Sequence, residues 1–267
     1  MPKKLTHQLI GVTSGRNFRE LGGYRTLSGK TIKYHKLIRT GNWSNLSPAG
    51  QTYLHQYGVK TIIDFRSQVE VTKGPDRVPE DTRYHYAPVF STDLTNASKG
   101  MNDLNVSAHD DGRFGFKNMI SAYEDMIQSS SAQKAYRTFF DLLLANTAAN
   151  EAVAFHCTAG KDRTGFAALL ALTALGVPLT TIKTDYLLTN ITTQDFVSGM
   201  LNKASQHGAN HNVLQAIRDI QSVRPEYLDH SLKLINHDYN GLNAYLHQVM
   251  HLSSADIMEL RHIYLTA

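Results

Sequence analysis

The order of hydrophobic and polar positions changes along the chain. In the first half, short apolar runs over 59–64, 84–89 and 152–155 predict buried strands, the last of them typical of a parallel sheet covered on both faces. Between these runs, apolar residues at helical spacing predict helices from Phe116 onward and over 132–144. This alternation of strands and helices predicts an α/β core.

Turn and cap residues sharpen the boundaries. Ser28-Gly29 lies between two β-rich runs within residues 16–40 and predicts a hairpin. Ser47-Pro48 predicts the N-cap and first turn of a helix that ends at Gly58. Residues 91–115 are rich in Ser, Asn, Asp and Gly, which predicts a loop.

The second half is almost continuously helical in its pattern. A break at 175–178 (Leu-Gly-Val-Pro) ends one helix, and Ser253 with Asp256 resembles a capping box at the start of the last one. The sequence therefore predicts an α/β core with a helical extension, within a single domain spanning 1–267.

Composition narrows the class of protein. The chain has 267 residues, of which 42% are hydrophobic and 19% charged, as in ordinary globular domains. No apolar run approaches the ~20 residues of a membrane helix, and the N-terminus lacks the apolar core of a signal peptide. We therefore expect no membrane insertion and a cytoplasmic location, with a secreted form open if a signal was removed.

The net charge is +4, yet no block of five or six basic residues occurs. We therefore expect no nucleic-acid partner. The positive excess suits a polyanionic ligand or is simply an evenly solvated basic surface. Cys157 is the single cysteine, so no intrachain disulfide can form, and its thiol is either a buried small hydrophobe or a reactive group.

The neighbours of Cys157 favour the reactive group. The segment 156–165 reads His-Cys-Thr-Ala-Gly-Lys-Asp-Arg-Thr-Gly and stands between a predicted strand and a predicted helix at 163–175. A short loop entering a helix N-terminus directs several backbone N–H groups into one concavity, which forms an anion site. Arg163 offers a planar fork to two phosphate oxygens. The same field favours the Cys157 thiolate, which is the nucleophilic form.

The remaining residues of this segment support that chemistry. Gly160 and Gly165 permit unusual dihedral angles and close approach. Thr164 can donate its hydroxyl to the thiolate, and His156 orients the loop through hydrogen bonds. The residues expected to line the phosphate are Thr158, Ala159, Gly160, Lys161 and Thr164. The alternative is a structural cysteine at a strand-to-helix turn, which would not require the adjacent Lys-Asp-Arg cluster.

The 156–165 segment resembles the signature of the bacterial tyrosine and lipid phosphatases called tyrosine phosphatase family 3, which include secreted phosphatases of mycobacteria and Listeria. Other segments resemble that family's motifs, although Glu20 stands where the family usually has Asp. They are Asn-Phe-Arg-Glu-Leu-Gly-Gly at 17–23, Leu-Ile-Arg-Thr at 37–40, Ile-Asp-Phe-Arg-Ser at 63–67 with Glu70, Asp-Tyr-Leu-Leu-Thr-Asn at 185–190, and the tail 225–265.

The resemblance implies a fold of the protein tyrosine phosphatase type with a lid of two helices, for which residues 195–222 fit. Ordinary core packing is the alternative for the apolar stripe there, and the sequence alone favours it. Arg19, Arg39 and Arg66 would brace the core by pairing with Asp64, Glu70 or Asp185. A direct substrate role for Arg66 is the less favoured alternative.

A carboxyl group is the simplest donor of a proton to the leaving oxygen. The resemblance suggests Asp162, whose alternative role is to cap the following helix. Asp93, Asp103, Asp110 and Asp111 of the polar segment are the reserve candidates.

The resemblance also bears on the substrate. It associates a lysine at position 161 with phosphoinositide substrates, whereas a solvated lysine is the alternative. We therefore expect activity on phosphotyrosine proteins and consider phosphoinositides as a second substrate class. In either case a phosphate or another oxyanion would occupy the site.

Two other functional classes compete with the phosphatase. A phosphate-binding module without turnover could lose the thiol of Cys157 freely, and a sulfur-transfer enzyme of rhodanese type fits the Cys-x5-Arg-Thr-Gly pattern poorly. The chemistry needs no cofactor or metal. His207 and His211 have the nearest spacing to a metal site, which Gly208 between them weakens.

Overall fold

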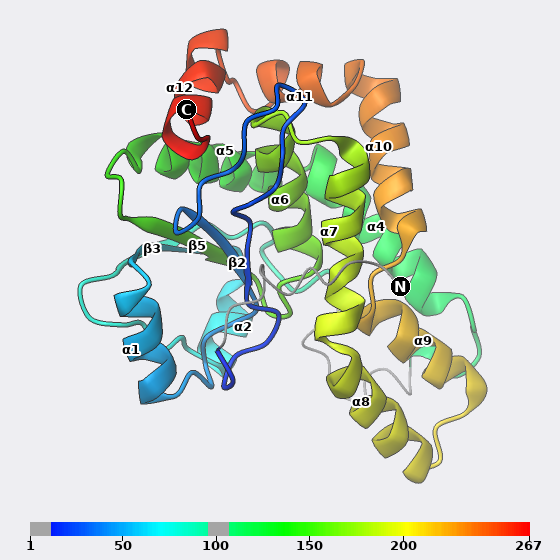
Figure 1. Cartoon of the computed structure of the whole chain (residues 1–267). Helices are drawn as coiled ribbons and strands as arrows, with labels where there is room; N and C mark the ends of the chain where they lie inside the picture. Colours follow the sequence, from blue (N-terminus) through cyan, green and yellow to red (C-terminus); the bar gives the residue numbers. More distant parts are fainter. Residues whose placement is uncertain (1–11, 96–106) are drawn as a thin grey trace.

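The computed structural model describes residues 12–95 and 107–267 and is built around a five-stranded sheet (Figure 1). The strand order is β1-β2-β5-β3-β4. Strand β1 (Arg19–Glu20) runs antiparallel to β2 (Leu37–Thr40), whereas β2, β5 (Ala152–His156), β3 (Val59–Asp64) and β4 (Arg83–Tyr86) run parallel to one another. The expected α/β core is confirmed.

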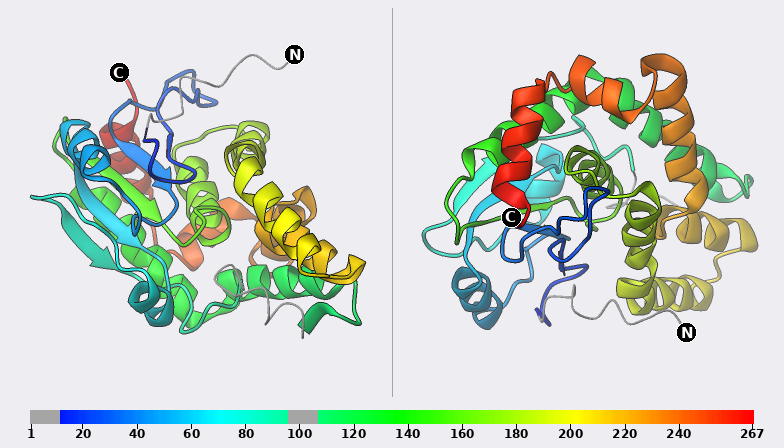
Figure 2. Two further views of the ribbon diagram at one scale, coloured as in Figure 1. Left: turned by 90° about the horizontal axis from the view of Figure 1, so that it is seen from below. Right: turned by 45° about the horizontal axis from the view of Figure 1, so that its top comes forward.

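The two faces of the sheet are buried by different helices, since successive side chains of a strand alternate between faces. Ile38, Ile62 and Ala154 pack with Trp43 and Leu54 beneath α1 (Pro48–Gln56). The neighbouring residues Leu37, Ile63 and Phe155 face the larger core. This core includes side chains of α4 (Phe114–Gln128), α5 (Ser130–Ala145) and α6 (Asp162–Ala174). Figure 2 shows most helices gathered on that side of the sheet.

The helices after α1 follow the predicted pattern with small shifts of their ends. Helix α4 begins at residue 114 and α6 at residue 162, slightly before the predicted starts. Ser47 caps α1 and the Ser253–Asp256 capping box is present. The bounds are α2 (Gln68–Lys73), α4 (Phe114–Gln128), α5 (Ser130–Ala145), α6 (Asp162–Ala174), α7 (Leu179–Thr192), α8 (Gln194–Gln206), α9 (His211–Gln221), α10 (Pro225–Tyr239), α11 (Leu242–Gln248) and α12 (Ser254–Tyr264).

Two extended predictions are modified. The hairpin around Ser28-Gly29 forms, but its pairing is limited to a single bridge between Arg25 and Thr31 and a few hydrogen bonds. The strand expected over 84–89 ends at Tyr86, although the backbone N–H of Val89 still donates to the carbonyl of Phe65. Much of the loop expected over 91–115 lies outside the described residues.

The helical extension packs against the core helices. Helices α9 and α10 contact α4, α11 contacts α6, and α12 contacts α5. Helix α9 buries Val213, Ile217 and Ile220, which fits the core-packing alternative for its apolar stripe. Helix α8 differs. The structure describes all of its residues, and among them only Ala204 is buried.

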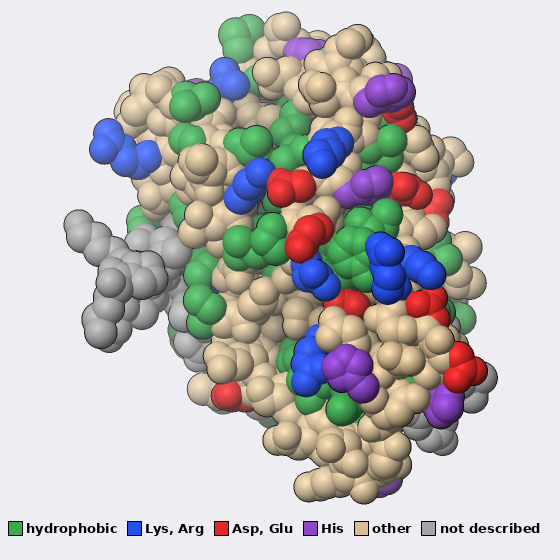
Figure 3. Space-filling model, turned by 90° about the vertical axis from the view of Figure 1, so that its right-hand side faces the viewer, with side chains coloured by type: hydrophobic (Ala, Val, Ile, Leu, Met, Phe, Trp, Pro, Cys, Tyr) green, Lys and Arg blue, Asp and Glu red, His purple; other side chains and the backbone are tan. Residues whose placement is uncertain are grey.

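The surface carries both signs of charge. On the face seen from the right of Figure 1, basic, acidic and histidine side chains interleave with apolar ones (Figure 3). Among the described residues, the structure contains no helix with the length and apolar character needed to span a membrane.

Candidate active site

The loop 157–161 lies at the carboxyl edge of the parallel strands, where ligands of open α/β sheets bind. It follows β5 and leads into α6, while β2 and β3 end beside it because Thr40 and Asp64 are both in register with His156. Cys157 is the first loop residue, with a free thiol and only 2% of its surface exposed. The sequence prediction of a strand, a loop and a helix is confirmed here.

Side chains outside the loop hold its carbonyl groups. The amide Nδ2 of Asn17 donates to the carbonyls of residues 159 and 160, at 3.2 and 2.7 Å. Arg39 Nη2 donates to the carbonyl of residue 160 at 2.9 Å, and Asn42 donates to that of residue 158 through its backbone N–H and through Nδ2. Each peptide group points its N–H opposite to its C=O. These contacts therefore turn the loop N–H groups away from Asn17, Arg39 and Asn42.

Those N–H groups form the candidate anion site. Within 12–95 and 107–267, the backbone N–H groups of residues 158–161 have no protein acceptor. Gly160 has a φ of +68°, and a Cβ there would lie 2.3 Å from the carbonyl oxygen of Thr40. Only glycine fits this turn, because the conformation is left-handed and the neighbouring backbone leaves no space. Consecutive N–H groups of this kind make an anion-binding concavity.

Arg163 is held by a carboxylate that the sequence did not pair with it. Its Nη1 and Nη2 donate to Oε2 and Oε1 of Glu70, at 2.7 and 2.8 Å, and the hydroxyl of Thr158 donates to Oε1 as well. Burial raises the pKa of Glu70, but the hydrogen bonds and charge of Arg163 outweigh it and lower that pKa to about 2. Glu70 therefore stays ionised and fixes the plane of the guanidinium. No local sequence pattern indicates that Glu70 and Arg163 pair.

Two buried donors of this segment are left without a partner among the described residues, Nε of Arg163 and the hydroxyl of Thr164. Buried donors normally have an acceptor, so an oxyanion in the concavity would satisfy them. The predicted hydrogen bond from Thr164 to Cys157 is not made in this structure.

Asp162 begins α6 and is buried with its partners. Its Oδ1 accepts a hydrogen bond from the hydroxyl of Tyr123 at 3.0 Å, and its Oδ2 accepts one from the ammonium group of Lys161. Lys161 is fully buried, so the alternative of a solvated lysine is wrong. No side-chain cap bond is made at the start of α6.

Comparison with known proteins decides the family. A family model described as the tyrosine phosphatase family matches residues 10–266. The chain belongs to this family. A protein of Cupriavidus necator named as a member of the tyrosine-protein phosphatases is 31% identical over 253 residues, which cover 93% of this chain and 85% of that protein.

Two further relatives are also named as phosphatases. The triple specificity protein phosphatase of Mycobacterium tuberculosis is 28% identical over 276 residues, covering 93% of this chain and 96% of that protein. A tyrosine-protein phosphatase of Nostoc commune is 28% identical over 236 residues, covering 84% and 72%. The expected fold class, a protein tyrosine phosphatase-like sheet flanked by helices, is thereby confirmed.

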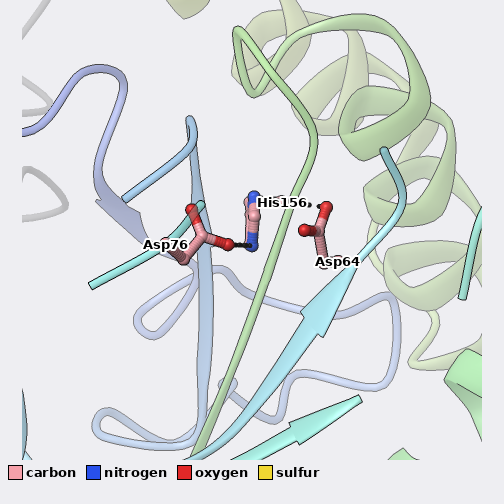
Figure 4. A group of neighbouring side chains, drawn as sticks. All are labelled: Asp64, Asp76 and His156. Carbon is pink, nitrogen blue, oxygen red and sulfur yellow. Dashed lines mark ion pairs between the residues drawn. The ribbon is translucent and has the colours of Figure 1, made fainter. Parts of the chain in front are cut away.

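Behind the loop 157–161 lies a cluster of charged residues whose side chains are at most 2% exposed. It consists of His156, Asp64 and Asp76, which Figure 4 shows, together with Arg66. His156 Nε2 is 3.1 Å from Asp76, and Nδ1 is 3.8 Å from Asp64 and 3.2 Å from the carbonyl of Cys157. Burial lowers the pKa of His156, but the two carboxylates outweigh it and raise that pKa. The two carboxylates thus favour the charged form of His156, whose ring contacts the peptide group of Cys157.

Three of these residues, Asp64, Asp76 and His156, are the one group of described residues with the spacing of metal ligands. Arg66 Nη2 already lies 2.7 Å from Asp64 and 2.6 Å from Asp76. Burial raises the pKa of Asp64, whereas the charge of His156 and the bonds from Arg66 lower it to about 2. Arg66 and His156 both pair with these two carboxylates, which disfavours binding of a cation between them.

Asp185 of α7 supports the loop indirectly. Arg39 Nη1 lies 2.5 Å from its Oδ2, and Arg19 Nη1 lies 3.6 Å from its Oδ1. The expected pairing of Arg19, Arg39 and Arg66 with buried carboxylates is confirmed, except that Glu70 pairs with Arg163.

Of the reserve candidates for the proton donor that the structure describes, one lies beside the loop and two lie elsewhere. Asp93 Oδ1 lies 3.7 Å from Arg163 Nη2, so this residue is beside the loop. Asp110 and Asp111 are exposed and pair with His109 and Lys117 instead. Asp103 lies outside the described residues.

Proposed function

We propose that the protein is a cysteine-dependent phosphomonoesterase that dephosphorylates phosphotyrosine proteins through a cysteinyl-phosphate intermediate. The observation that carries this proposal is the orientation of the loop, whose carbonyl groups are bound by Asn17, Arg39 and Asn42 while its N–H groups have no described acceptor. Preorganised N–H donors around a thiol suit the charge of a phosphoryl group in the transition state.

The reaction would proceed in two steps. The Cys157 thiolate attacks phosphorus, the S–P bond forms and the bond to the leaving oxygen breaks, while Asp162 gives that oxygen a proton. Water then attacks phosphorus, the S–P bond breaks, and the carboxylate of Asp162 accepts the proton from the water. Arg163 and the N–H groups of residues 158–161 hold the phosphoryl oxygens throughout, joined by the hydroxyl of Thr164.

The supporting residues act through this loop. His156, with Asp64 and Arg66 behind it, contacts the carbonyl of Cys157. Gly165 allows α6 to pass close to Tyr186, since a Cβ there would lie 3.2 Å from the Tyr186 ring. These contacts favour a support role for Arg66 over direct contact with the substrate.

Hydrolysis of p-nitrophenyl phosphate without added metal tests the nucleophile. We expect the Cys157→Ser variant to lose turnover and to retain phosphate binding, because the concavity is intact. Equal rates for the two proteins would contradict the proposal. Phosphate binding with no turnover in the unaltered protein would favour the binding module, and thiocyanate formation from thiosulfate and cyanide would favour sulfur transfer.

Comparison of leaving groups tests the acid. We expect Asp162→Asn to slow the hydrolysis of phenyl phosphate more than that of p-nitrophenyl phosphate, because a poor leaving group needs the proton more. The same experiment with Asp93→Asn tests the nearest reserve acid. A leaving-group effect in Asp93→Asn alone would transfer the role to Asp93.

We also propose phosphoinositides as a second substrate class. The resemblance to the family supports this, because it associates a lysine at position 161 with phosphoinositide substrates. The mycobacterial relative is named a triple specificity phosphatase, which indicates more than one class of substrate for that protein. Lys161 is paired with Asp162, so substrate would have to recruit an ammonium group that is already engaged. Release of phosphate from soluble phosphoinositides, compared between the unaltered protein and Lys161→Met, tests it, and no release from any of them would exclude this class.

We propose that residues 1–267 form one phosphatase domain in which α8 and α9 act as a lid. Two observations support the lid. Most of α8 is exposed, and its Phe196 ring lies 4.0 Å from the guanidinium carbon of Arg16, measured to the ring centroid. Arg16 directly precedes Asn17, which binds the loop. Proteolysis with and without vanadate tests the lid, and cleavage of α8 at the same rate in both conditions would contradict it.

A further inference from the structure

Two buried tyrosines meet the carboxyl group of Asp162 from helices distant in sequence. Tyr123 of α4 donates to Asp162 Oδ1 at 3.0 Å, and its hydroxyl is 2.7 Å from the hydroxyl of Tyr186 in α7. Both tyrosines are almost entirely buried, at 0% and 2% exposure. Their hydroxyls therefore face one another and Asp162 in place of water.

The direction of these hydrogen bonds follows from the donor count. A phenol has one hydrogen, and the Tyr123 hydrogen is used on Asp162, so Tyr186 must donate to Tyr123. Burial and the charge of Asp162 raise the pKa of Tyr123 well above its ordinary value, and burial raises that of Tyr186 likewise. Both phenols therefore keep their hydrogens, and the chain runs from Tyr186 through Tyr123 to Asp162.

Helix α7 supports the carboxyl-terminal end of the loop and the first turn of α6 through two successive residues. Asp185 pairs with Arg39, whose other terminal nitrogen donates to the carbonyl of Gly160. Tyr186 reaches Asp162 through Tyr123 and lies against Gly165. The position of Tyr186 is thus fixed by close packing as well as by its hydroxyl, which makes it a rigid anchor for Tyr123.

We propose that Tyr123, anchored by Tyr186, is a positioning residue that holds the carboxyl group of Asp162 in the orientation needed for proton transfer to and from the reacting oxygen. This inference rests on the proposed role of Asp162 as the general acid. The torsion that rotates a carboxyl group is broad, so one partner does not fix its plane. Lys161 on Oδ2 and Tyr123 on Oδ1 hold it at both oxygens.

Phenylalanine at position 123 removes the hydroxyl and keeps the ring. We expect Tyr123→Phe to lower kcat for phenyl phosphate by roughly tenfold or more, because a carboxyl group that rotates away from the leaving oxygen no longer donates its proton in line. The fall for p-nitrophenyl phosphate should be much smaller, with KM little changed. The Tyr186→Phe variant should show the same pattern in weaker form, since Tyr123 still reaches Asp162.

Tyr245→Phe is the matched control. Tyr245 is fully buried and its hydroxyl donates to the carbonyl of Ile127 at 2.8 Å, so its removal also costs one buried hydrogen bond without touching the loop. We expect a lower unfolding temperature and an unchanged ratio of the two rates. Equal slowing of both substrates by Tyr123→Phe, or no slowing, would overturn the positioning role.

A double-mutant cycle separates this inference from the proposed function. In an Asp162→Asn background, Tyr123→Phe should no longer alter the dependence on leaving group. If Asp162→Asn alone shows that dependence and Tyr123→Phe does not, only the positioning role fails. If Asp162→Asn shows no dependence, the acid assignment and the positioning role fail together, whereas the Cys157→Ser test of the nucleophile still stands.

Discussion

The carboxylate of Glu70 binds both terminal nitrogens of Arg163, with Nη1 2.7 Å from Oε2 and Nη2 2.8 Å from Oε1. Glu70 is the third residue of α2 and forms a capping box with Ser67, so its backbone position is fixed before it reaches Arg163. The guanidinium is thereby held in one plane beside Cys157. The oxygens of a phosphoryl group would meet a donor that is already oriented.

This pair predicts a loss of catalysis on neutralising Glu70. In Glu70→Gln only one side-chain oxygen remains as an acceptor, so we expect kcat/KM for p-nitrophenyl phosphate to fall roughly ten- to hundredfold through misplacement of Arg163. Glu20→Gln is the control, because Glu20 is equally buried but bonds to Gly22, His35 and Tyr57. An unchanged or higher kcat/KM in Glu70→Gln would mean that Glu70 does not orient Arg163.

The same pair predicts a stability change in acid. The pKa of Glu70 is lowered from 4.5 to about 2, so its contribution to the free energy of unfolding is present above about pH 4.5 and is lost as the pH falls through 2. We expect the difference in unfolding free energy between the unaltered protein and Glu70→Gln to shrink over that interval. Urea unfolding at a series of pH values measures it, and a difference that is constant with pH would contradict the prediction.

His156 should be mostly charged at pH 6.5. Its pKa is raised above 6.5 because Asp64 and Asp76 outweigh burial, so its stabilising charge is fully present below about pH 6.5 and is lost as the pH rises through the higher folded value. We expect ring ¹⁵N chemical shifts of an imidazolium at pH 6.5, and a smaller charged fraction in Asp76→Asn. A neutral imidazole at pH 6.5 would refute this account.

Asn17 should control the affinity for phosphate. Asn17→Ala removes the amide that binds the carbonyls of residues 159 and 160, so the loop N–H groups lose their fixed direction. We expect inhibition by inorganic phosphate to weaken by roughly tenfold. Asn146→Ala is the control, because Asn146 is also buried and its amide donates to the carbonyl of Glu151, away from the loop. Equal affinities for all three proteins would remove Asn17 from the site.

Gly160 should tolerate no side chain. Gly160→Ala would place a Cβ 2.3 Å from the carbonyl oxygen of Thr40, in addition to the strain of its φ of +68°. Gly29→Ala has a φ of +84° with no atom within 4 Å, and so carries the strain alone. We expect a stability loss of about 1 kcal/mol without loss of activity for Gly29→Ala, and loss of phosphatase activity for Gly160→Ala. Full activity in Gly160→Ala would contradict this prediction, because it would show that the backbone around residue 160 can shift to make room for a Cβ.

Local signals account for what the sequence predicted. Serine caps, proline and glycine positions and the period of apolar residues act over a few residues, so the helix after Ser47 and the strand over 59–64 could be located. The predicted hairpin near Ser28 forms with only one bridge, because the extent of pairing depends on the partner strand and not on the turn alone. The acid role of Asp162 stays a prediction.

By itself, the sequence determined the strand, the short loop and the helix that carry Cys157 and Arg163, and from their five-residue spacer it predicts that both face one concavity. Only the tertiary structure decided which residues orient the loop. Glu70 and Arg163 are 93 residues apart, Asn17 and Gly160 are 143 apart, and Tyr123 and Asp162 are 39 apart. Such pairs leave no periodic or local mark on a sequence, since each partner is placed by the packing of a different helix or strand against the sheet.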